Sequence, residues 1–149
     1  MKNKWLVVAD LGSMKAYKVD ENSLNSHPRL ELIDAFENPE VHHKLSEKLS
    51  DQAGQFARGS RGAGASHDIA SGERHNIELE QRRRWLRQLA ERLQHVLRRS
   101  DLDVCWLAAG KEINHSLLDE LLPDARAKIE KNVVANLSKL EKAELLGHF

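Results

Sequence analysis

The sequence predicts an α/β fold with a mixed five-stranded sheet, in which three antiparallel strands are followed by two strands linked through helices. A continuously apolar run at residues 5–9 and a second strand pattern at 103–109, apolar from Val104 onward, are typical of central strands covered on both faces. A long helical pattern separates these runs, and a second helical pattern follows the later one. Strands that alternate with helices favour parallel pairing within one sheet.

The first third of the chain predicts three strands that pair as a meander. After residues 5–9, the segment Asp10-Leu11-Gly12-Ser13 supplies turn chemistry, so residues 14–19 should pair back on the first strand. Residues 30–36 alternate well enough for a third antiparallel strand. A short helix is predicted over residues 39–49. The segment at about 52–72 is rich in glycine, serine and arginine, and we expect it to be a mobile loop.

The long helix is predicted over residues 71–99 because apolar residues recur there at spacings of three, four and seven. Such a helix carries one apolar stripe that must cover a sheet. The stripe consists of Leu79, Leu86, Leu89, Ala90, Leu93, Val96 and Leu97. Trp85 also lies in this helix, and we interpret it as a core residue.

The last third predicts a strand at 103–109, a helix over about 112–122 that ends before Pro123, and a strand at 128–135. Ser138 and Glu141 have the spacing of a capping box, which predicts a short C-terminal helix. Three antiparallel strands followed by right-handed crossovers form the ribonuclease-H-like arrangement. The 149 residues suffice for one domain.

Charge is segregated along a chain whose net charge is zero. Residues 58–99 hold ten Lys+Arg, all of them arginine, against five Asp+Glu, and both flanking segments are acidic. Arginine presents a planar fork of donors that suits phosphate or carboxylate. The single cysteine excludes a disulfide within one chain, and residues 5–9 are too short for a signal-peptide core or a membrane span. We therefore expect a soluble, cytoplasmic protein without membrane insertion.

The arginines predict a surface for nucleic acid or another polyanion. Arg84, Arg87 and Arg98 share the helix face roughly opposite the apolar stripe. Three further arginines, in the loop and at the start of the helix, are expected to approach the same partner: Arg58, Arg61 and Arg74. The competing interpretation is a solvated helix face, neutralised by nearby glutamates: Glu78, Glu80 and Glu91.

Other candidate sites have simpler explanations. Asp10 ends the first strand, where a ribonuclease-H-like nuclease places a metal-binding carboxylate, with Asp34 and Asp103 as weak companions. We favour a turn-forming role for Asp10. The histidines lack the spacing of a helical zinc site, so no metal and no cofactor is predicted. Cys105 is interpreted as a packing residue.

The whole chain resembles a bacterial family usually labelled host-attachment protein, or protein required for attachment to host cells. The resemblance rests on short motifs spread along the chain: Trp5 to Asp10, Phe36-Glu37-Asn38-Pro39, Ser50 to Gln55, Leu107-Ala108-Ala109, and Asn136 to Leu140 before Glu144-Leu145. That family is similar to the central domain of eukaryotic and archaeal class-1 peptide-chain release factors. There, a Gly-Gly-Gln loop before a long basic helix promotes peptidyl-tRNA hydrolysis.

In this sequence Ser71, Gly72 and Glu73 stand in the comparable place, and one glycine and the glutamine are missing. The resemblance therefore implies a non-enzymatic binding protein that contacts the ribosome, tRNA or another polyanion through the basic loop and the arginine-rich helix. One alternative is an indirect or regulatory role in attachment to host cells through protein partners. A second is residual hydrolase activity, as a peptidyl-tRNA esterase or a nuclease.

Overall fold

The computed structural model describes residues 3–21, 28–42 and 65–149, with the backbone alone described at 65–74. The strands are β1 (Lys4–Asp10), β2 (Ser13–Asp20), β3 (Arg29–Glu37), β4 (Val104–Ala109) and β5 (Ile129–Val134). The helices are α2 (Ala65–Leu97), α3 (Asn114–Asp119), α4 (Pro123–Arg126) and α5 (Lys142–Leu145), followed by the 3-10 helix η1 (Leu146–His148). Residues 39–42 are also helical.

The five strands form one mixed sheet in the order β3-β2-β1-β4-β5. The β1–β2 and β2–β3 pairs are antiparallel, whereas β4 pairs with β1 in parallel and β5 pairs with β4 in parallel. The predicted α/β class, with three antiparallel strands followed by helix-linked strands, is confirmed. Each predicted strand agrees with the structure to within one or two residues.

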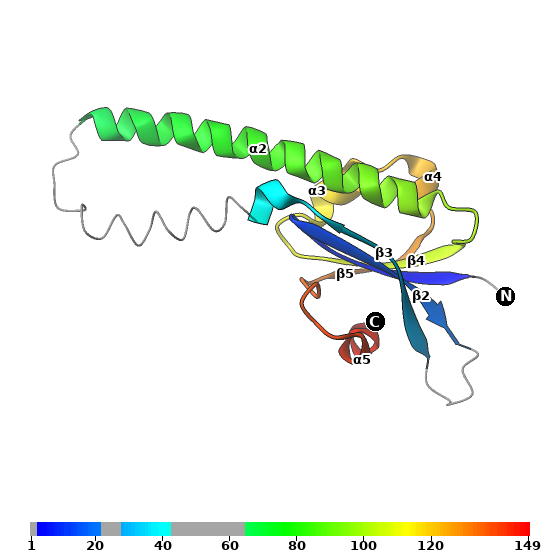
Figure 1. Ribbon diagram of the computed structural model, residues 1–149. Helices are drawn as coiled ribbons and strands as arrows, with labels where there is room; N and C mark the ends of the chain where they lie inside the picture. The colour runs from blue at the N-terminus through cyan, green and yellow to red at the C-terminus, as the bar shows by residue number, and fades with distance from the viewer. Residues whose placement is uncertain (1–2, 22–27, 43–64) are drawn as a thin grey trace.

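Helices cover the two faces of the sheet unequally. Helix α2 crosses one face with α3 and α4 beside it, and in the described part of the chain the opposite face carries only α5 and η1 (Figure 1). The first core cluster lies beneath α2 and includes Trp5, Leu89 and Leu93, all fully buried. The second cluster joins Leu6 and Tyr17 to Leu145 of α5. The sheet therefore separates a large core from a small one.

Helix α2 is longer than the sequence predicts at its start. It begins at Ala65, six residues before the expected Ser71, and ends at Leu97. At about 1.5 Å per residue its 33 residues span roughly 50 Å, and its first half projects beyond the sheet (Figure 1). Residues 65–72 were predicted as loop and are helical in the structure. The rest of that segment, 52–64, lies outside the described residues.

The C-terminal part of the fold departs from prediction at two points. The predicted 112–122 helix is shorter in the structure, where α3 covers Asn114–Asp119, and a separate helix that was not predicted, α4, begins at Pro123. Proline is well suited to that position, since its missing N–H has no partner there in any helix. The predicted capping box is wrong. Glu141 is the N-cap of α5, and the Ser138 hydroxyl instead contacts Asp10 Oδ2 at 2.7 Å.

Edge strand β3 contains a bulge at Ile33. Leu32 pairs with Tyr17 and Asp34 pairs with Ala16, so Ile33 is an extra residue in the ladder. Before the bulge, Leu30 belongs to the small core, and after it Phe36 packs against the large core. The bulge therefore rotates the second half of β3 toward α2.

Residues 39–42 are attached to the β1–β2 turn through Gly12. The Asn38 N–H donates to Gly12 O at 2.8 Å, and Val41 is buried against this glycine. A Cβ atom on Gly12 lies 2.9 Å from Val41 Cγ1, which is closer than packed carbon atoms approach. The turn and the 39–42 helix thus fit only while residue 12 has no side chain.

We expect Gly12→Ala to lower the free energy of unfolding by about 1–3 kcal/mol, because the added methyl overpacks the contact with Val41. Urea denaturation measures the change. Gly147→Ala is the matched control, since a Cβ at Gly147 meets nothing within 4 Å. In a Val41→Ala background, Gly12→Ala should lower the free energy of unfolding by less than it does in the wild type, because the crowded methyl group is gone. Equal stability of the Gly12 and Gly147 variants would contradict this packing argument.

Candidate nucleic-acid interface

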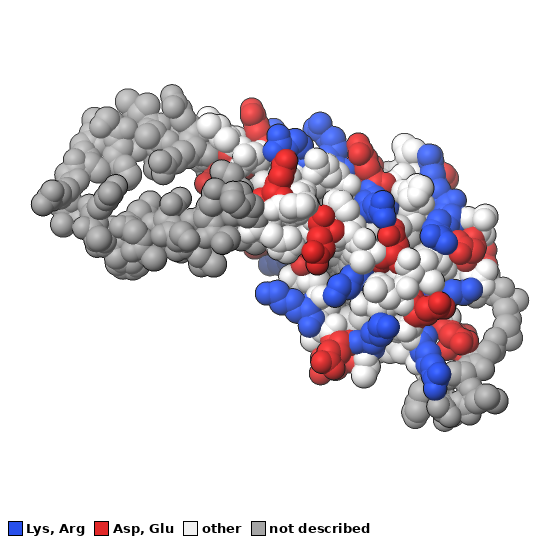
Figure 2. All heavy atoms as spheres, viewed as in Figure 1, with Lys and Arg blue, Asp and Glu red and all other residues white. Residues whose placement is uncertain are grey.

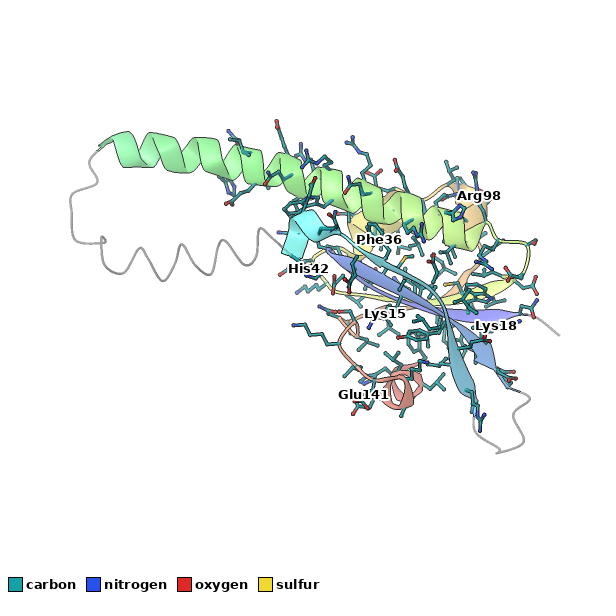
Figure 3. All side chains as sticks on the ribbon, in the orientation of Figure 1. Lys15, Lys18, Phe36, His42, Arg98 and Glu141 are labelled. Carbon is teal, nitrogen blue, oxygen red and sulfur yellow. The ribbon has the colours of Figure 1, made fainter. Side chains whose placement is uncertain are left out.

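The outward face of α2, together with the residue that directly follows its C-terminal end, carries the three arginines that the sequence selects. Arg84, Arg87 and Arg98 are all exposed, and Figure 3 shows Arg98 near the C-terminal end of α2, on the side away from the sheet. Arg74 lies in the first part of α2, of which only the backbone is described. Arg58 and Arg61 lie outside the described residues. Three of the six predicted arginines can therefore be placed.

Two of these arginines are held by carboxylates. Arg84 Nη2 lies 3.0 Å from Glu40 Oε2, and Arg98 Nε lies 3.4 Å from Asp124 Oδ2. All four side chains are more than half exposed, and exposed pairs of this kind contribute about 0–1 kcal/mol. Replacing the carboxylate by a phosphate at either arginine therefore costs little free energy. Within the described part of the chain, Arg87 forms no ion pair.

Charge on the visible surface is mixed. Lysine and arginine side chains alternate with aspartate and glutamate, without one large patch of a single sign (Figure 2). Exposed glutamates on α2 itself include Glu80 and Glu91. A polyanion on this face would meet local repulsion as well as attraction, so its affinity should be modest and sensitive to salt.

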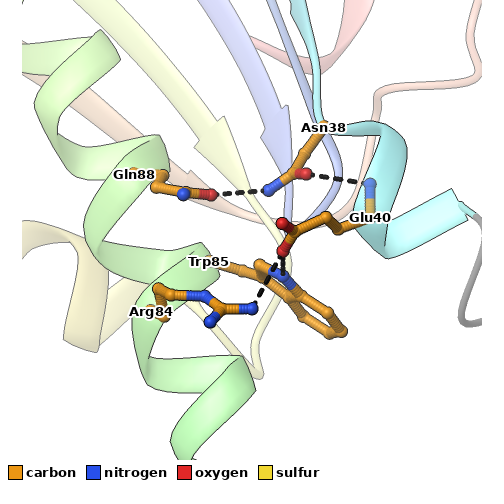
Figure 4. Close-up of polar contacts among 5 residues, drawn as sticks. All are labelled: Asn38, Glu40, Arg84, Trp85 and Gln88. Atoms are coloured by element: carbon orange, nitrogen blue, oxygen red, sulfur yellow. Dashed lines mark hydrogen bonds and ion pairs between the residues drawn. The ribbon is translucent and has the colours of Figure 1, made fainter.

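A hydrogen-bonded network fixes residues 39–42 on α2 (Figure 4). Asn38 acts as the helix N-cap, since its Oδ1 accepts the Glu40 N–H at 3.1 Å, and its Nδ2 donates to Gln88 Oε1 at 2.8 Å. Glu40 Oε2 accepts the Trp85 indole N–H at 2.9 Å as well as the Arg84 guanidinium. The Trp85 hydrogen bond, followed by Arg84, lowers the pKa of Glu40. Glu40 therefore stays ionised around neutral pH, so its weak ion pair with Arg84 persists there.

Beside this network lies an open groove between β3 and α2, which we name the α2–β3 groove. Its volume is about 550 Å³. Six residues line it together with Glu91: Phe36, Asn38, Pro39, Gln88, Arg92 and His95. Figure 3 shows Phe36 between β3 and α2. The groove lies next to the arginine face, because Gln88 follows Arg84 by one helical turn.

The sequence analysis missed this groove. Gln88, Glu91, Arg92 and His95 do recur at helical spacing, so a second, polar stripe beside the leucine stripe was visible in principle. The other wall comes from residues about fifty positions earlier, and only the bulged course of β3 brings Phe36 under this stripe. A single sequence offers no signal for that juxtaposition.

The family model described as "Protein required for attachment to host cells" matches residues 5–149. This chain belongs to that family. The match covers nearly the whole sequence, so it includes both walls of the α2–β3 groove and the arginine face of α2. A comparison with curated proteins finds no match.

In this family member three other arginines, in α2 or just beyond its C-terminal end, contact carboxylates. Arg92 Nη2 donates to Asp34 Oδ1 at 2.7 Å, and Arg99 forms a two-point pair with Asp101 at 2.9 and 3.1 Å while lying over the Trp5 ring. Arg82 pairs with Glu112 of the loop before α3 at 3.0 Å. These contacts connect α2 to the sheet and to the α3 region.

The carboxylates weighed as a metal site do not converge. Asp10 Oδ1 accepts the Gly12 N–H at 2.8 Å, which confirms its turn-forming role. Asp34 is held by Arg92, and Asp103 accepts the Asn3 N–H at 2.8 Å. Among the described residues, no group of three or more His, Cys, Asp or Glu is placed to hold a metal ion.

Four further expectations from the sequence concern the backbone at Ser71–Glu73, Trp85, Cys105 and membrane-spanning helices. Ser71, Gly72 and Glu73 lie inside α2 rather than in a loop, so the resemblance to a release-factor loop does not extend to their backbone. Trp85 is buried, as expected of a core residue, and Cys105 is fully buried in β4. In the part of the chain that the structure describes, no helix is long and apolar enough to span a membrane.

Proposed function

We propose that this host-attachment family member is a non-catalytic RNA-binding protein whose contact element is the outward face of α2. The observation that carries the proposal is the placement of Arg84, Arg87 and Arg98 on one exposed face, where Arg84 and Arg98 form only weak, exposed ion pairs that a phosphate can displace. Arginine–phosphate contacts of this kind depend little on base sequence. The partner class is ribosomal or transfer RNA in the cytoplasm.

The sheet order supports the evolutionary side of this proposal. An order of β3-β2-β1-β4-β5, with two parallel crossovers, is compatible with a ribonuclease-H-like domain and with descent from a release-factor-like ancestor. The helical backbone at Ser71–Glu73 and the dispersed carboxylates favour loss of hydrolysis over its retention. A domain descended from such an ancestor would keep the RNA-binding surface after losing the catalytic loop, and so would bind RNA without hydrolysing peptidyl-tRNA.

The direct test is co-sedimentation with purified ribosomes, and a filter-binding assay with transfer RNA, across a salt series from 50 to 200 mM. With about three phosphate contacts, the logarithm of affinity should fall against the logarithm of salt with a slope of about −2 to −3. The triple variant Arg84→Gln/Arg87→Gln/Arg98→Gln should bind at least about tenfold more weakly and lose most of that slope.

The matched control removes the same charge elsewhere. Arg29, Lys111 and Lys139 are exposed and lie outside α2, so their joint change to glutamine should leave RNA affinity within about twofold. If this control falls as far as the α2 variant, binding reflects net charge alone. If the wild type does not bind even at 50 mM salt, the arginine face is only solvated and the proposal fails.

The family description favours a second candidate, a role in attachment to host cells. We propose that this role is indirect and regulatory, exerted through RNA contact or through a protein partner. Complementation of a deletion strain in a cell-adhesion assay separates the two routes. If the α2 triple variant restores attachment as well as the wild type, the role does not run through the arginine face.

A further inference from the structure

The α2–β3 groove has the composition of a site for a flat, polar ring. Phe36 and Pro39 supply apolar surface, and the exposed side chains of Gln88 and His95 supply hydrogen-bonding groups. Its volume of about 550 Å³ lies in the range of small-molecule sites. An aromatic surface beside amide groups is the combination that proteins use to stack a nucleobase and contact its edge.

The walls of the groove are fixed before any ligand arrives. Asn38 is held twice, by the Glu40 N–H and by Gln88 Oε1, and Arg92 is held by Asp34. Gln88 accepts the Asn38 hydrogen bond through its side-chain oxygen. Its amide nitrogen, which carries two N–H donors, has no hydrogen-bond partner among the described residues. The Gln88 amide nitrogen is thus an available donor on a rigid frame.

Charge identifies the part of a nucleotide that fits. The Arg92 cation is offset by Asp34, and Glu91 adds a second carboxylate at the same groove. A phosphate would meet little net attraction there, whereas a neutral base with acceptors and donors on its edge would not be repelled. The phosphates have a better position nearby, since Arg84 and Arg87 lie within one turn of Gln88 on the solvent side.

We infer that the α2–β3 groove holds one unstacked nucleobase of an RNA strand whose phosphates run along the α2 arginines. This inference rests on the proposed RNA-binding function and adds the form of RNA: single-stranded or looped, with a base free to leave its stack. Phe36 is the stacking surface, and Gln88 contacts the base edge.

The first measurement compares a single-stranded ten-nucleotide RNA with a duplex of the same length by fluorescence anisotropy. The wild type should prefer the single strand. Phe36→Leu, which keeps an apolar side chain against the core, and Gln88→Met should each weaken single-strand binding about fivefold or more and leave duplex binding unchanged. Thermal melts of both variants show that they fold. Equal single-strand affinity of wild type and both variants, or a preference for duplex, would overturn the inference.

A second measurement separates this inference from the proposed function. Adenosine monophosphate at millimolar concentration is titrated into the labelled protein while the side-chain amide signals are followed by NMR. The Asn38 and Gln88 signals should shift, and Gln94, which bonds the Leu122 N–H on another side of α2, should not. Shifts without oligonucleotide binding would support the groove and defeat the proposed function. Oligonucleotide binding without shifts, unchanged in both groove variants, would do the reverse.

Discussion

Leu93→Ala should lower the free energy of unfolding by about 2–5 kcal/mol, whereas Leu79→Ala should change it by less than about 0.5 kcal/mol. Both leucines belong to one periodic stripe of α2, and only their surroundings differ. Leu93 is 0% exposed and packs in the large core, whereas Leu79 is 40% exposed where α2 leaves the sheet. Truncation of Leu93 therefore leaves a cavity, whereas truncation of Leu79 shortens a side chain that is already partly in contact with water at the margin of the core.

Urea denaturation followed by circular dichroism measures both changes in the free energy of unfolding. The two variants are directly comparable, since they carry the same substitution at two positions of one helix. A loss for Leu79→Ala that approaches that of Leu93→Ala would show that the projecting part of α2 is covered in solution. Values near zero for both would mean that α2 contributes little to the large core, which contradicts its burial pattern.

The Cys105 thiol should react with iodoacetamide at least about a thousandfold more slowly in the folded protein than in urea at pH 8. Complete burial raises its pKa from 9.0 to about 12, which reduces the reactive thiolate by about three powers of ten before steric exclusion is counted. Mass spectrometry of time points gives both rates. Fast labelling of the folded chain would show that β4 opens readily.

The same pKa shift predicts a dependence of stability on pH. Above pH 9 the unfolded chain loses the thiol proton while the native chain keeps it until about pH 12. The unfolded state then binds fewer protons, so the stability contributed by this group falls by up to about 1.4 kcal/mol per pH unit in that window. The difference between wild type and Cys105→Ala isolates it, since other groups titrate equally in both proteins.

The sheet was predictable because its signals are local. Apolar runs marked β1 and β4, and turn residues marked the β1–β2 hairpin, so strand types and most boundaries followed. The helix limits were harder. Gly72 and the surrounding small residues favour a loop by intrinsic propensity, and α2 nevertheless extends back to Ala65. Periodicity also predicted that Leu79 is as buried as Leu93, because the spacing of apolar residues along a helix does not show where the sheet beneath it ends.

The candidate interface was only half visible in the sequence. The arginine face of α2 is a single-helix pattern and could be found from residue spacing. Its ion pairs with Glu40 and Asp124 could not, since each joins segments that are distant in the chain. The groove needed Phe36 to be rotated under α2 by an irregular ladder. The Ser138–Asp10 hydrogen bond, which displaced the expected capping box, is likewise a contact between opposite ends of the sequence.

The bulge at Ile33 also determines how β3 meets other chains. As an edge strand of nine residues, β3 offers unpaired backbone groups to any second strand. The bulge interrupts the regular ladder, and charged side chains such as the exposed Glu31 lie along this edge, two features by which natural proteins oppose the addition of a second strand. The irregularity that shapes the groove thus also disfavours growth of the sheet into a larger assembly.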